Sequence, residues 1–167
     1  MSLARYERYS GTSGSPRDFT EFPAQFLEHY ASAPEVLPLY AKHYQTGEVL
    51  PAALVTKLQE ASTHNQGFKT TEFIAASLLD LAWHKLDAEA LSKITDVEAF
   101  ENKILKDYGL PEIIGPRYKT PYFAHIFSSP SGYSAGYYAY LWSEILDADG
   151  FTAVSYTHLT LPTTPYV

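Results

Sequence analysis

The sequence predicts an all-α protein, a multi-helical bundle with one long irregular loop. The first observation is that apolar residues recur at steps of three and four in several segments, which is the period of a helix. The second is that no convincing run of alternating apolar and polar residues marks a set of strands. The 167 residues are 46% hydrophobic and 19% charged, a composition that supports a globular fold with its own core.

The first predicted helix starts at Ser15 and Pro16, because serine suits an N-cap and proline suits a first turn. Its apolar face continues at helical spacing to Tyr30. Pro23 either kinks this helix or marks its true start. Pro34 prevents the helix from continuing and is predicted to end it.

Two further helices are predicted before residue 68. One spans about 34–45 and ends at Gly47. The next starts near Pro51 and stops at the His-Asn-Gln-Gly run, in which Gly67 provides the C-cap. Its predicted buried face consists of Leu54, Leu58 and Ala61.

The middle of the chain contains the most apolar helix. Residues 70–86 are rich in alanine and leucine and are predicted to lie in the interior. Asp96 is predicted to cap the next helix, which ends at Gly109. Residues 110–134 contain Pro111 and three further prolines and are predicted to form the long loop, a length that is often functional.

The last helix is predicted to run from Ser134 or Ala135 to about Asp149. Residues 152–167 contain five threonines and no charged residue, and they do not continue its period. Two interpretations stay open for this tail. It pairs as a short extended strand, or it is foreign sequence appended where the natural reading frame ends, and we favour the second.

Charge and composition exclude several classes of partner. The net charge is −7 and the pI is about 5.3, so the chain has no basic stripe for a nucleic acid. It has no cysteine, which excludes disulfides and thiolate metal sites and suits a reducing compartment, so we expect a cytoplasmic location. No apolar run approaches the roughly 20 residues that span a membrane, and no membrane partner is expected.

Tyrosine is the unusual component, with 14 residues in the chain. Residues 125–144 read HIFSSPSGYSAGYYAYLWSE and gather four tyrosines and one histidine behind a flexible loop. A tyrosine pairs a large apolar ring with a hydroxyl that needs a partner. The excess therefore indicates either amphipathic packing or a wet cleft lined by aromatic rings.

Three segments between about Tyr9 and Phe151 resemble one family. They are SGTSGSPRDFTEFPAQFLEHY, HNQGFKTTEFIAASLLDLAWH and YFAHIFSSPSGYSAGYYAYLWSEILDADGF. In this order they resemble the zinc oligopeptidase family that includes thimet oligopeptidase, oligopeptidase A and the bacterial peptidyl-dipeptidases, with the last two segments most similar to the peptidyl-dipeptidase branch. The resemblance implies that residues 1–151 are the C-terminal portion of a zincin-type catalytic domain, and that residues 152–167 lie outside it.

The resemblance assigns a metal ligand to Glu21. In this family a His-Glu-x-x-His helix supplies two imidazoles to zinc, and a glutamate on a following helix is the third protein ligand. The matching residue here is Glu21, with Arg17 and Asp18 beside it; from the residues alone, Glu21 would be a solvated carboxylate that suits a helix N-terminus. No His-Glu-x-x-His occurs in the 167 residues, so the resemblance places that helix before Met1. We expect zinc only in the intact parent, with none bound and no peptidase activity in this chain alone.

The resemblance also gives the tyrosine-rich stretch a role. Donors aimed at a carbonyl oxygen stabilise the charge that develops on it during hydrolysis. The catalytic donors are expected to be His125, Tyr133 and Tyr140, and the residues that bind substrate are expected to be Gly132, Tyr137 and Arg117. Tyr137 and Tyr140 are predicted to share one helix face, and Arg117 to bind the free C-terminus of the peptide. The spacing from His125 to Tyr133 is longer than the family's common form, because SSPS replaces a compact glycine-rich turn.

Two function hypotheses follow. In the first, the chain is a fragment of a zinc peptidyl-dipeptidase, which releases C-terminal dipeptides from oligopeptides. In the second, it is a non-enzymatic helical module for interaction or oligomerisation, with the tyrosine-rich helix as its contact face. A truncated domain would expose apolar surface, so we also expect self-association.

Overall fold

The computed structural model describes residues 5–12 and 14–159, which form two compact units. Unit 1 contains residues 1–55 and 139–167, and unit 2 contains residues 56–138. The boundaries fall inside α3 (Ala52–Ser62) and at the start of α8 (Ala139–Leu159). The described residues are helical apart from turns and one isolated bridge between Lys42 and Val49, which confirms the predicted all-α class. None of the described helices combines the length and the apolar character needed to cross a bilayer.

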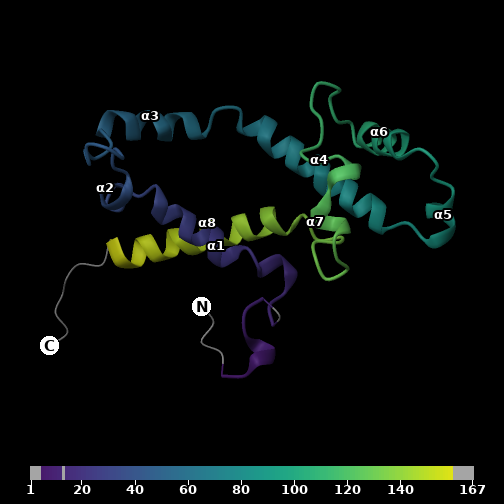
Figure 1. The fold of residues 1–167 in the computed structure, drawn as a ribbon, viewed down its shortest axis with the longest axis horizontal. Helices are drawn as coiled ribbons and strands as arrows, with labels where there is room; N and C mark the ends of the chain where they lie inside the picture. Colours follow the sequence, from purple (N-terminus) through teal and green to yellow (C-terminus); the bar gives the residue numbers. More distant parts are fainter. Residues whose placement is uncertain (1–4, 13, 160–167) are drawn as a thin grey trace. The chain divides into compact units, whose positions relative to one another are not determined.

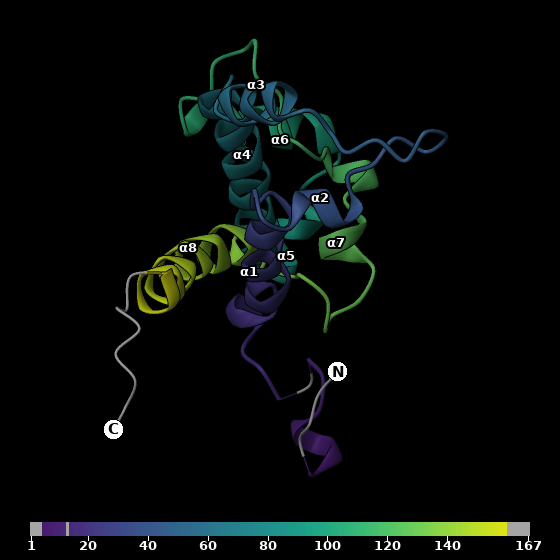
Figure 2. The same cartoon turned by 90° about the vertical axis from the view of Figure 1, so that its left-hand side faces the viewer.

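Unit 1 is built on two helices that are far apart in the sequence. α1 (Phe22–Ala31) packs against α8 and crosses it at an angle (Figures 1 and 2). The shorter elements of this unit are η1 (Glu7–Tyr9), η2 (Arg17–Phe19) and α2 (Leu37–Tyr40).

Aromatic rings fill the contact between α1 and α8. The ring of Phe26 stacks on Phe22 at 5.7 Å and meets Phe151 edge-on at 6.0 Å, both measured between ring centroids. Gly150 lies at this contact, where an added Cβ would lie 3.4 Å from the Cζ of Phe22. The apolar face predicted for this first helix is therefore its contact face, and the burial of apolar area drives the pairing.

Polar contacts also join the two helices of unit 1. Nε2 of His29 lies 2.6 Å from Oδ1 of Asp147, and the ring of His29 stacks on Phe151. The hydroxyl of Ser143 donates to the carbonyl of Asp18 at 2.8 Å. Both Ser143 and Asp147 are buried, so these contacts replace the water that their polar groups lose.

Unit 2 has its core between α4 (Gln66–His84) and α6 (Val97–Asp107). Ala75, Leu79 and Leu105 are its buried apolar centre, which confirms that the alanine-rich segment lies in the interior. Its shorter elements are α5 (Ala88–Ser92), η3 (Thr120–Tyr122) and α7 (Ala124–Phe127). The cap predicted for α6 is also present, because Oδ1 of Asp96 accepts the amide of Ala99 at 2.9 Å.

Several predicted helix ends in the first half are wrong. The first α-helix begins at Phe22 rather than Ser15, so Pro23 marks its true start. Only Leu37–Tyr40 of the predicted helix at 34–45 is helical, because the chain then turns back through Gly47, whose φ is +74°. The left-handed residue at the next junction is Asn65, with φ of 55°, and Gly67 lies inside α4.

The predicted buried face of α3 is also wrong. Leu54 is 45% exposed and Leu58 is 61% exposed, and no residue of this helix is buried. Spacing identifies an apolar face, but it does not show that anything within the chain covers that face.

The last helix differs from the prediction at both ends. It begins at Ala139, because Ala135 takes a φ of +53° and its amide binds a side chain instead of continuing a helix. It continues beyond Asp149 to Leu159, so residues 152–159 form neither a strand nor a break in the helix. The remaining tail residues lie outside the described residues, and the foreign origin of 152–167 stays a prediction. The predicted loop at 110–134 is irregular but contains two short helical turns, η3 and α7.

Candidate functional site

Three of the predicted site residues lie together in unit 2. The ring of His125 on α7 meets the ring of Tyr133 at 5.9 Å and that of Tyr137 at 5.4 Å, both edge-on. The ring of Tyr118 lies 4.9 Å from His125, again between centroids. We call this group of rings the His125 cluster, and its members are Tyr118, Phe123, His125, Tyr133 and Tyr137.

The loop between His125 and Tyr133 is closed by backbone hydrogen bonds. The amide of Tyr133 donates to the carbonyl of His125 at 3.0 Å, and the amide of Gly132 donates to the carbonyl of Ser129 at 2.9 Å. A Cβ at Gly132 would lie 3.0 Å from the Ser129 oxygen and 3.2 Å from the His125 oxygen. Gly132 is therefore required for the tight closure that returns the chain to His125.

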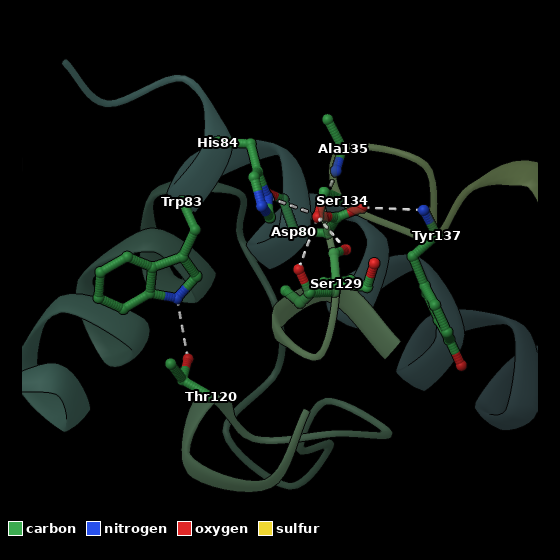
Figure 3. A network of polar contacts seen from close by, with 9 residues as sticks. Asp80, Trp83, His84, Thr120, Ser129, Ser134, Ala135 and Tyr137 are labelled. Atoms are coloured by element: carbon green, nitrogen blue, oxygen red, sulfur yellow. Dashed lines mark hydrogen bonds and ion pairs between the residues drawn. The ribbon is translucent and has the colours of Figure 1, made fainter. Parts of the chain in front are cut away.

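A buried carboxylate of α4 binds the residues that directly follow this loop. Oδ1 of Asp80 accepts the amide of Ala135 and Oδ2 accepts the amide of Tyr137, each at 2.8 Å (Figure 3). Nδ1 of His84 lies 2.8 Å from Oδ1 of Asp80. The hydroxyl of Ser134 donates to the carbonyl of Ile126 at 2.8 Å, which ties the same loop to α7.

The members of the cluster differ in exposure. His125 and Tyr133 are partly exposed. Tyr137 is only 3% exposed and packs its ring against Phe73 and Phe123. In this geometry Tyr137 supports the ring of His125 from the interior side.

Arg117 lies directly before the cluster in the chain. Its side chain is exposed, and its amide donates to the carbonyl of Glu72 on α4 at 2.9 Å. The next residue, Tyr118, stacks on Phe123 and contacts His125. The position of Arg117 beside the cluster is thus set by α4 on one side and by Tyr118 on the other.

Glu21 and Tyr140, the two other predicted site residues, belong to unit 1. Glu21 is the N-cap residue of α1 and is partly buried, and its carbonyl accepts the amide of Gln25 at 3.0 Å. The side-chain amide of Gln25 donates to the carbonyl of Tyr140 at 3.1 Å. One side chain therefore joins the first turn of α1 to the first turn of α8.

The prediction that Tyr137 and Tyr140 share a helix face is wrong. Tyr137 precedes α8 and lies in a turn of unit 2, whereas Tyr140 lies in the first turn of α8. The physical reason is the φ of +53° at Ala135, which a right-handed helix starting before Tyr137 cannot contain.

No group of three histidine, aspartate or glutamate side chains that could hold a metal ion occurs in residues 5–12 and 14–159. The assignment of Glu21 as a metal ligand stays a prediction.

Three contributors to this geometry were not predicted from the sequence. They are Asp80, Tyr118 and Gln25. The sequence did contain an indication of the role of Asp80, because a lone acid within an alanine- and leucine-rich interior helix must find hydrogen-bond partners when it is buried. The sequence contained no such indication for Tyr118 or Gln25, since an aromatic residue in a loop and a glutamine on a helix are common on surfaces.

The architecture is that of an all-helical chain whose histidine and tyrosine side chains gather behind a glycine-dependent loop. The model of peptidase family M3 matches residues 1–162, and the chain belongs to that family. This confirms the family inferred from the three sequence segments.

Individual relatives agree with this assignment. The chain is 46% identical over 149 residues to dipeptidyl carboxypeptidase of Escherichia coli strain K12, covering 88% of the chain and 21% of the relative. It is 45% identical over 153 residues to the Salmonella typhimurium protein of the same name, covering 90% of the chain and 22% of the relative. Oligopeptidase A of Escherichia coli is 35% identical over 144 residues, or 86% of the chain and 20% of that protein. The chain thus spans about a fifth of the length of these relatives.

Proposed function

We propose that the chain is the C-terminal portion, through residue 151, of the catalytic domain of a zinc peptidyl-dipeptidase that releases dipeptides from the C-terminus of oligopeptides. The higher identity to the dipeptidyl carboxypeptidases, 46% against 35% for oligopeptidase A, supports this branch of the family. The observation that carries the proposal is the meeting of His125 and Tyr133, two potential hydrogen-bond donors, at a partly exposed position. The absence of cysteine suits the reducing cytoplasm, where we place the enzyme.

Zinc enters this proposal through a longer parent protein. Glu21 would provide a carboxylate ligand there, and the remaining ligands would come from residues outside this chain. When bound, zinc lowers the pKa of a coordinated water and polarises a carbonyl. The chain alone is proposed to bind no zinc and to hydrolyse no peptide.

The residues of this chain are proposed to bind the peptide and to stabilise charge. His125, Tyr133 and Tyr140 would donate hydrogen bonds to the oxygen of the attacked carbonyl, where each such donor contributes about 3–4 kcal/mol. Arg117 would bind the terminal carboxylate, since a guanidinium can do so with two parallel hydrogen bonds. Gly132 gives the loop its closure, and Tyr137 fixes the ring of His125.

Peptide binding tests this proposal in the chain itself. A tetrapeptide with a free C-terminus is titrated into labelled protein, and the amide resonances of His125 and Tyr133 are expected to shift. The same peptide with an amidated C-terminus should shift them less, and Arg117→Gln should remove the difference. Resonance changes confined to residues far from the cluster would count against the proposal.

Zinc-dependent turnover provides the second test. The purified chain, mixed with zinc and a quenched oligopeptide, is expected to show no hydrolysis. Activity that is lost in Glu21→Ala and kept in Glu28→Ala, an exposed glutamate of α1, would refute the proposed inactivity.

Self-association is the second candidate function, and one observation favours it. α8 presents Trp142, Ile145 and Leu146 with 50%, 59% and 37% exposure, although its other face packs on α1. Exposed apolar stripes of this kind favour association. Light scattering is expected to show a dimer or larger species that Ile145→Glu dissociates, and a monomeric wild-type chain would contradict this.

A further inference from the structure

Asp80 is the most deeply buried acid of unit 2. It has 0% exposure and lies on α4 beside the buried residues Ala76 and Leu79. A carboxylate in such surroundings is strongly destabilising unless hydrogen bonds replace its lost water. The groups that bind this carboxylate therefore indicate its role in the fold.

The partners of Asp80 are two backbone amides of one turn and the ring of His84, whose Nδ1 lies 2.8 Å from Oδ1 of Asp80. Its two oxygens accept the amides of Ala135 and Tyr137 separately, each at 2.8 Å, as Figure 3 shows. Backbone amides of a turn that point toward one anion resemble the concave anion-binding arrangement known as a nest. Here the enclosed anion is a side chain of the protein itself.

The turn is held in a conformation that it would not adopt unaided. Ala135 has a φ of +53°, which costs about 1–2 kcal/mol for a residue with a Cβ. The two hydrogen bonds to Asp80 offset this cost, because bonds to a charged acceptor are stronger than those between neutral groups. The conformation of residues 135–137 therefore depends on the carboxylate.

The same turn carries the rings of the His125 cluster. Tyr137 donates its amide to Asp80 and places its ring 5.4 Å from that of His125. The amide of Gly136 donates to the carbonyl of Tyr133 at 2.8 Å, so the position of Tyr133 is linked to the same turn. A shift of the turn would therefore displace both tyrosines relative to His125.

We propose that Asp80 is a positioning residue, which fixes the turn at 135–137 so that Tyr133 and Tyr137 lie against His125. It acts through the backbone and does not itself contact a substrate. Its importance for catalysis rests on the function proposed above, whereas its effect on the turn does not.

The wild-type chain provides the first test. Amide hydrogen exchange, followed residue by residue by NMR, is expected to show protection at Ala135 and Tyr137, although both lie outside any helix. Exchange at the rate of an open chain at both positions would overturn the proposal without the need for a variant.

Asp80→Asn provides the second test, because it keeps the shape and removes one acceptor. At least one of the two amides should exchange about tenfold faster or more. The ring-proton resonances of His125, which the neighbouring rings shift, should move toward their values in an unstructured peptide. Unchanged exchange and unchanged His125 resonances would overturn the proposal; should the variant not fold, the wild-type exchange decides.

Glu101→Gln is the matched control. Glu101 is also buried in unit 2, at 2% exposure, and one of its oxygens accepts the amide and the hydroxyl of Thr120 at 2.9 and 3.0 Å. The chemical change is the same, so a similar loss of stability is expected while the His125 resonances stay in place. Equal movement of these resonances in both variants would show general loosening and would overturn the specific role of Asp80.

The peptide titration separates this inference from the proposed function. Displaced His125 resonances in Asp80→Asn, together with no peptide binding by the wild-type chain, would leave the positioning role standing and reject the peptidase site. Peptide binding that is unaffected by Asp80→Asn would support the site and reject the positioning role.

Discussion

Nε2 of His29 on α1 lies 2.6 Å from Oδ1 of Asp147 on α8, and Asp147 is only 2% exposed. This contact joins two helices that are separated by most of the chain. It satisfies a buried carboxylate at the centre of unit 1, in the way that the amides of a turn satisfy Asp80 in unit 2.

Removal of His29 is expected to destabilise unit 1. His29→Ala leaves the buried oxygen of Asp147 without this donor and removes the stacking on Phe151, so the free energy of unfolding should fall by about 1–3 kcal/mol. Urea denaturation followed by circular dichroism measures this change. Glu28→Ala, at an exposed neighbouring position, should alter stability by less than about 0.5 kcal/mol, and an equal loss in both variants would contradict the prediction.

Gly132 is expected to tolerate no side chain. Gly132→Ala places a Cβ 3.0 Å from a backbone oxygen, so the loop must open and stability should fall by about 1–3 kcal/mol. Gly115→Ala is the matched control, because nothing lies within 4 Å of a Cβ there. Thermal unfolding of the two variants should separate them clearly, and equal melting temperatures would show that the closure is not tight.

Replacement of Ala135 by glycine is expected to stabilise the protein. With φ at +53°, Ala135→Gly relieves strain from the Cβ and should raise the free energy of unfolding by about 1 kcal/mol. In contrast, Ala148→Gly at an exposed position inside α8 should lower it by about as much, because glycine is unfavourable in a helix. Denaturant midpoints that move in the same direction for both variants would disprove the assigned conformation.

Gly150 distinguishes a small side chain from a large one. Gly150→Ala should stabilise α8 by up to about 1 kcal/mol, since the new Cβ meets Phe22 at 3.4 Å and glycine is a poor helix former. Gly150→Leu should cost about 1–3 kcal/mol by forcing α1 away from α8. The prediction fails if leucine is tolerated as well as alanine in the same unfolding experiment.

The sequence predicted the elements of this fold better than their ends. The interior helix around Leu79 and the cap at Asp96 follow from local rules of spacing and capping, and both are present. The start of α8 depends on a contact between Asp80 and a turn 55 residues later, which no local pattern contains. Long-range hydrogen bonds of this kind are invisible to periodicity.

In the candidate site, too, residue identities could be predicted from the sequence, whereas long-range packing could not. Resemblance supplied the identities of His125 and Tyr133, and the structure brings these two together. It did not foresee that Tyr137 is buried, because the surrounding rings come from α4 and from the loop before α7. The roles of these residues in catalysis stay predictions.

The pairing of α1 with α8 has a consequence for biosynthesis. α1 ends at Ala31 and its partner begins at Ala139, so the ribosome must add about a hundred residues between them. At roughly 5–20 residues per second, the phenylalanine face of α1 waits on the order of 5–20 seconds for its cover, while unit 2 is synthesised as one continuous stretch. The apolar face of α1 therefore stays without its partner helix until α8 has been synthesised.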